Sequence, residues 1–127
     1  MSYVQQVEPE IVIRGVLDPG SPNFERILLH VTGPMTLSGL GITLALNSGG
    51  QFFPIFDNCF WFPNVSTERD TWVIVYSKRG SQEWTEFQGV PVLNLFWQRE
   101  STMFSRSAPN VVPMMFRVDG VASGDLL

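Results

Sequence analysis

The chain has 127 residues, 44% hydrophobic and 16% charged, and twelve acidic against eight basic side chains give it a formal net charge of −4. The length and the apolar fraction fit one folded domain, residues 1–127, with 1–9 and 119–127 as its termini. The negative charge and the scattered basic residues argue against binding to nucleic acid.

Runs of β-branched, aromatic and aliphatic residues, bounded by Gly, Pro, Asn or Ser, recur along the chain and predict an all-β fold. The first run alternates, with Ile11, Ile13, Gly15 and Leu17 on one face. The expected strands cover residues 10–17, 25–32, 42–47, 51–56, 59–62, 70–77, 92–98 and 111–118.

Turn-forming residues separate these strands. The pair Asp57-Asn58 predicts a turn between the strands at 51–56 and 59–62. Residues 81–89 read as a loop. Pro113 confines the last strand to a sheet edge, because proline cannot donate a ladder hydrogen bond.

The strand at residues 70–77 is apolar on both faces, and the strand at 92–98 behaves similarly. We expect the first of these to lie inside a sheet that is covered on both sides. A two-layer fold covers only one side of each sheet, so either residues 1–9 or another subunit must cover the outer side. We expect a twofold homodimer. Its contact is predicted to contain Trp61, Phe96 and either Trp72 or Val73.

Five apolar segments follow one another along the chain: the leucine-containing stretch 35–44, Phe60-Trp61-Phe62-Pro63, the Thr-Trp-Val-Ile-Val-Tyr run at 71–76, Leu95-Phe96-Trp97 and the stretch 114–118. The order of these segments is similar to that in the lamin-tail-like family. The resemblance implies an immunoglobulin-like antiparallel β-sandwich of about seven to nine strands. These are packing motifs, so the resemblance implies no catalytic residues.

Few residues offer catalytic or metal-binding chemistry. One histidine and one cysteine exclude a zinc site built from such ligands, and no cofactor is expected. His30 reads as a structural histidine, and no nucleophile-elbow pattern surrounds Ser38, Ser48 or Cys59. Cys59 has no neighbouring cation and is expected to be unreactive. We therefore expect a non-enzymatic chain, with a hydrolase based on His30 or on a carboxylate pair as the catalytic alternative. The close carboxylate pairs are Glu8/Glu10, Glu68/Asp70 and Glu83/Glu86.

Aromatic residues are the main functional signal, since six of the eleven residues from Phe52 to Phe62 are Phe or Trp. They serve either as core volume or as an exposed patch that docks a partner. If Phe60 and Phe62 face the core, alternation turns Trp61 outward. The candidate binding residues are Trp61, Phe56, Trp84, Phe87 and Phe96.

These residues predict an interaction or assembly module that binds a protein partner or itself. The alternative is a carbohydrate-binding module, in which Trp61, Trp84 and Phe87 stack on sugar rings while Asp57 and Asn58 form hydrogen bonds.

The first residues have neither the cationic start nor the apolar core of a signal peptide, and each apolar run is too short to span a bilayer. We therefore expect a cytoplasmic protein without membrane segments.

Overall fold

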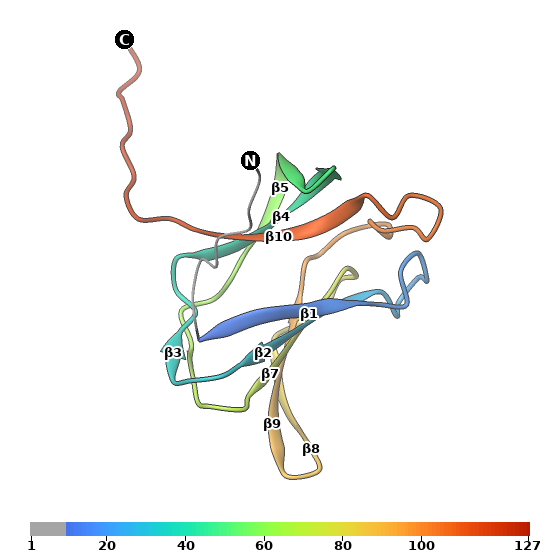
Figure 1. Ribbon diagram of the computed structural model, residues 1–127. Helices are drawn as coiled ribbons and strands as arrows, with labels where there is room; N and C mark the ends of the chain where they lie inside the picture. The colour runs from blue at the N-terminus through green and yellow to red at the C-terminus, as the bar shows by residue number, and fades with distance from the viewer. Residues whose placement is uncertain (1–9) are drawn as a thin grey trace.

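A computed structural model describes residues 10–127, which form ten strands in three sheets and no helix (Figure 1). The prediction of an all-β fold is confirmed, with one strand more than the upper expected number. In the larger sheet the order is β1 (Ile11–Leu17), β2 (Arg26–Val31), β7 (Trp72–Tyr76), β9 (Val90–Phe96) and β8 (Glu83–Phe87). The smaller sheet has the order β10 (Val111–Arg117), β4 (Leu40–Ser48) and β5 (Gln51–Trp61), while β3 (Met35–Thr36) pairs with β6 (Ser66–Thr67). The described residues contain no helix suited to crossing a membrane.

The larger and the smaller sheet share one apolar core. Leu29, Val73 and Leu93 enter it from the larger sheet, and Ile42 and Phe60 enter it from the smaller one. In Figure 1 the smaller sheet lies above the larger sheet, so the two form layers with the core between them. Each sheet therefore keeps one face directed away from the core.

The alternation expected for the first strand is wrong in its second half, because β1 contains a bulge. Ile13 pairs with Leu29 and the next paired residue is Gly15, so Arg14 is an extra residue. An extra residue reverses the faces that follow it. Val16 therefore packs against the core and Leu17 is exposed.

Strand β7 occupies the centre of the larger sheet, as its composition predicts. Val73 and Val75 are buried in the core, whereas Trp72 and Ile74 lie half-buried on the outer face. The complete burial of Val73 corrects the expectation that it could contact a partner.

The pairing of β7 with β9 is parallel, which departs from the expected antiparallel sandwich. The chain leaves β7, forms β8 at the far edge and returns through a hairpin into β9. Residues 83–87 are therefore a strand and not the expected loop. All five are exposed, so β8 owes its extended form to hydrogen bonds with β9 and not to a buried face of its own.

Strand β10 lies at the edge of the smaller sheet, which is the position that Pro113 predicts. It pairs with β4 over its whole length, from Val111 opposite Leu46 to Arg117 opposite Leu40. Residues 119–127 form no strand. The sequence predicts that either residues 1–9 or a partner covers an outer sheet face. Residues 1–9 lie outside the described part of the chain.

Candidate interaction surface

Strand β5 runs continuously from Gln51 to Trp61, which corrects the expectation of two strands joined by a turn. Ile42 of β4 pairs with Phe60, and Leu44 pairs with Ile55. Residues 56–59 therefore bulge out opposite a single residue of β4. Asn58 has a φ of 58°, so the turn-forming residue is used here for a bulge inside a strand.

Two long-range hydrogen bonds fix this bulge. The buried hydroxyl of Thr43 donates to the carbonyl oxygen of Ile55. The indole Nε1 of Trp97, a core residue, donates to the carbonyl oxygen of Asn58 over 2.8 Å. The bulge is thus held by the neighbouring strand and by the segment that follows β9.

The bulge places Phe56 and Trp61 on the same face of the smaller sheet. Trp61 lies opposite Gly41 on the outer face, while Ile55 lies opposite Leu44, which packs against the core. Phe56 follows Ile55 and therefore points outward. In a regular strand, residues five positions apart point to opposite faces, so only the bulge brings these two rings to one surface.

Phe116 of β10 lies between the two rings. Its centroid is 5.3 Å from that of Trp61 and 5.6 Å from that of Phe56, with interplanar angles of 85° and 83°. These are favourable edge-to-face contacts. Trp61 is 56% exposed and Phe56 is 63% exposed, whereas Phe116 is half-buried. We call these three residues the aromatic patch.

Gly41 lies directly beneath the Phe116 ring of the aromatic patch. A Cβ atom at this position would lie 2.6 Å from Cζ of Phe116, so the ring rests directly on the glycine backbone. Trp61, Gly41 and Phe116 form one row across β5, β4 and β10. The glycine allows the Phe116 ring to lie against the sheet, where both neighbouring rings reach it.

The surroundings of the aromatic patch are uncharged along the sheet. The register places Pro54 and Val112 beside Ala45, and Met114 beside Thr43, on the same outer face. Asp57 lies in the bulge at the rim and is exposed. An apolar centre with a polar, solvent-accessible rim is typical of a protein-binding surface.

The other candidate residues lie elsewhere. Trp84 and Phe87 are exposed on β8, three positions apart and therefore on opposite faces of that strand. Figure 1 shows the β8–β9 hairpin projecting away from the smaller sheet. Phe96 stacks on Tyr76 at a centroid distance of 5.2 Å and an angle of 14°, and it covers Gly80.

The expected dimer contact is wrong in its composition. Phe96 and Trp72 lie on the outer face of the larger sheet, whereas Trp61 lies on the outer face of the smaller one. The core separates them, so one contact cannot contain all three. The expected sugar-stacking set is likewise divided, because Trp84 and Phe87 belong to β8. Alternation predicts the face of a strand but not the sheet that the strand joins.

Sequence reasoning missed Phe116, the central ring of the aromatic patch. The stretch at 111–118 predicts a closing strand, but only its pairing with β4 shows that Phe116 lies beside Trp61. The one sequence signal is the glycine at position 41, a small residue within an apolar strand, which indicates close approach by another group.

The residues considered for catalysis form no assembled site in the described part of the chain. The His30 ring stacks on Trp72 at 4.3 Å, and its Nε2 lies 3.5 Å from Oδ1 of Asp70, while Nδ1 is buried without a hydrogen bond. Cys59 is half-buried in the bulge, and its low reactivity stays a prediction. The pairs Glu68/Asp70 and Glu83/Glu86 are exposed, and Glu8 lies outside the described residues. Residues 10–127 contain no group of three or more metal-ligating side chains.

Comparison with known proteins leaves the family undetermined. The chain matches no family model, no curated protein and no solved structure. The resemblance to the lamin-tail-like family stays a prediction.

Proposed function

We propose that the chain is a non-enzymatic interaction domain that associates with a second copy of itself through the aromatic patch. The observation that carries this proposal is the outward arrangement of Trp61 and Phe56 around Phe116, with both outer rings more than half exposed. An immunoglobulin-like β-sandwich is the framework that we propose for it. Two sheets that share one core support this framework.

The absence of charge on the face around the aromatic patch makes a second copy a compatible occupant. Each chain carries a net charge of −4, so two copies repel one another at long range. Around the aromatic patch, Pro54, Val112 and Met114 bring no charge to the face, so a twofold contact can place the centre of this face against itself while Asp57 stays at the exposed rim. A stable contact would bury about 1,200–2,000 Å² in total. Trp61 is of a residue type enriched among the positions that dominate binding energy, and Phe56 is of a type enriched in interface cores.

Light scattering over a wide concentration range tests the proposal. We expect the mass to rise above the 14.3 kDa of one chain as the protein concentration increases. Trp61→Glu should keep the protein monomeric, because it would bury a charge in the contact. Phe87→Glu is the matched control, since it places the same charge at an equally exposed aromatic residue on β8. A constant monomer mass for the wild type up to millimolar protein would contradict the proposal.

Electrophoresis in polysaccharide-containing gels tests the carbohydrate alternative on the same variants. Self-association predicts that the mobility is unaffected by the polysaccharide. Retardation of a monomeric wild type that disappears in Trp61→Glu, but persists in Phe87→Glu, would replace self-association by sugar binding at the aromatic patch.

A further inference from the structure

The parallel pairing of β7 and β9 brings two basic loop segments together. Tyr76 and Phe96 are paired at the carboxyl ends of these two strands, so the residues that follow each strand leave the sheet at the same end. The backbone N–H of Arg99 donates to the carbonyl oxygen of Ser77 over 2.8 Å. The side chain of Gln98 forms two hydrogen bonds with the backbone of Gly80. Its Oε1 accepts the Gly80 N–H, and its Nε2 donates to the Gly80 carbonyl oxygen over 2.6 Å. The two segments are therefore fixed against one another.

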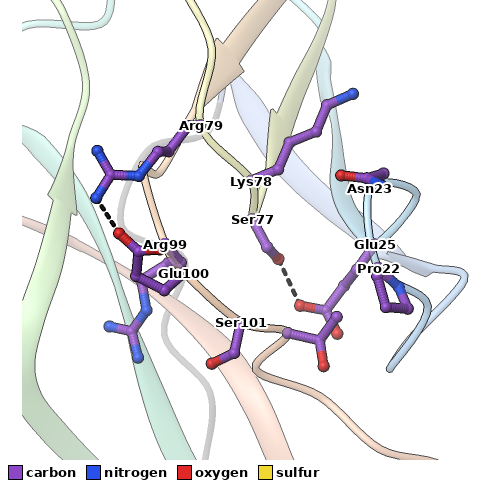
Figure 2. A pocket seen from close by; sticks show the side chains of 10 residues that line it. Pro22, Asn23, Glu25, Ser77, Lys78, Arg79, Arg99, Glu100 and Ser101 are labelled. Atoms are coloured by element: carbon purple, nitrogen blue, oxygen red, sulfur yellow. Dashed lines mark hydrogen bonds and ion pairs between the residues drawn. The ribbon is translucent and has the colours of Figure 1, made fainter.

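A pocket of about 450 Å³ lies between these segments and the loop that connects β1 to β2. Figure 2 shows Arg79, Arg99 and Glu100 along one side of it, and Asn23 and Glu25 along the other. With Lys78, the lining holds three of the eight basic residues of an acidic chain. This volume is within the range of small-molecule sites.

Glu25 has no capacity left for a ligand. Its side chain is 1% exposed. Its Oε2 accepts the N–H groups of Gly20 at 2.8 Å and Phe104 at 3.0 Å. Its Oε1 accepts the N–H of Met103 at 2.7 Å and the hydroxyl of Ser77. A carboxylate that accepts four hydrogen bonds has used its lone pairs, so Glu25 does not offer a cation site.

The second carboxylate of the lining, Glu100, is bound by Arg79. Lys78 is placed over the ring of Tyr76, with Nζ 5.2 Å from the centroid. Arg99 is half-buried as a residue and lines the pocket, and its guanidinium forms no ion pair or hydrogen bond within residues 10–127. The uncommitted charge of the pocket is therefore positive.

We propose that this pocket binds a small molecule through a phosphate or sulfate group, with the Arg99 guanidinium as the principal contact. A guanidinium binds such tetrahedral oxyanions through two parallel hydrogen bonds, and partial burial strengthens the attraction. Ser101 and Thr102 belong to the same lining, and their hydroxyl groups are neutral donors available to such a ligand. Lys78 and Arg79 add to the positive potential without a direct contact being required. The proposal is independent of the aromatic patch, which lies on the other sheet.

Titration followed by backbone amide NMR tests the proposal at constant ionic strength. The probes are inorganic phosphate and glucose 6-phosphate, with glucose as the uncharged comparison. We expect saturable shifts at residues 99–102 with both phosphates and none with glucose. Arg99→Gln should weaken the binding roughly tenfold or more, because it removes the bidentate contact. Lys78→Gln should weaken it less and serves as a second variant if Arg99→Gln disturbs the loop.

Arg69→Gln is the matched control, because Arg69 is exposed and precedes β7 at the end opposite to the pocket. It removes the same charge and should leave the affinity unchanged. Tighter binding of glucose 6-phosphate than of inorganic phosphate would support a phosphorylated metabolite as the ligand class, and equal binding would support the free anion. Shifts that do not saturate, or equal affinities in Arg99→Gln and Arg69→Gln, would overturn the proposal.

Discussion

Substitution of Glu25 by glutamine should destabilise the fold strongly, although it changes the side chain by one atom. The amide nitrogen would occupy the Oε1 position, because the Ser77 hydroxyl can reverse and accept a hydrogen bond from it. The N–H of Met103 also points at that position and cannot reverse. One buried donor therefore loses its acceptor, whereas the bonds from Gly20 and Phe104 persist to a neutral oxygen.

The magnitude follows from these bonds. An unpaired buried N–H costs about 1–3 kcal/mol. Each of the two remaining bonds loses about 1 kcal/mol with the charge of the acceptor, and the easier burial of a neutral group offsets about 1 kcal/mol. The free energy of unfolding should fall by about 2–4 kcal/mol, a large part of the total for a domain of this size.

Urea unfolding followed by tryptophan fluorescence measures the effect of Glu25→Gln. With a slope of about 2 kcal/mol per molar urea, the midpoint should fall by about 1–2 M. Glu100→Gln is the control, because its carboxylate is exposed and its pair with Arg79 contributes about 0–1 kcal/mol. Equal midpoints for the two variants would refute the role assigned to the four hydrogen bonds.

Three further substitutions test the packing of the sheets. Gly41→Ala should lower the free energy of unfolding by about 1–3 kcal/mol and weaken self-association, because the new methyl group displaces the Phe116 ring from the aromatic patch. Urea unfolding measures the first effect and light scattering the second. Unchanged self-association would contradict the contact assigned to Gly41 and Phe116. Val73→Ala should cost about 2–4 kcal/mol, and Ile74→Ala on the half-buried outer face should cost less, as measured by urea unfolding. The reverse order would show that the two faces of β7 are assigned wrongly.

Strands with a strong pattern of their own could be predicted from the sequence. In β2 the buried residues Ile27, Leu29 and Val31 alternate without interruption, so the local pattern and the final burial agree. Phe60 and Phe62 are buried as alternation requires, and Trp61 between them is exposed. In these cases the face that a residue occupies follows from its two neighbours.

Features decided by distant partners could not be predicted. Glu25 has the sequence context of a charged residue at the start of a strand, and its burial depends on donors from Ser77, Met103 and Phe104. Strand β8 carries no buried residue, so no pattern distinguishes it from a loop. The pocket arises because β7 and β9 are parallel, and the direction of a pairing is not encoded in either strand alone.

The residues of the aromatic patch are synthesised at different times. Trp61 and Gly41 belong to the β4–β5 hairpin, whereas Phe116 belongs to β10, which is synthesised much later. On a growing chain the hairpin therefore emerges with a bare glycine where the Phe116 ring will lie. Domains fold as units during synthesis, so the aromatic patch is completed only when β10 docks beside β4. The proposed self-association would therefore be open only to chains whose synthesis has passed Phe116.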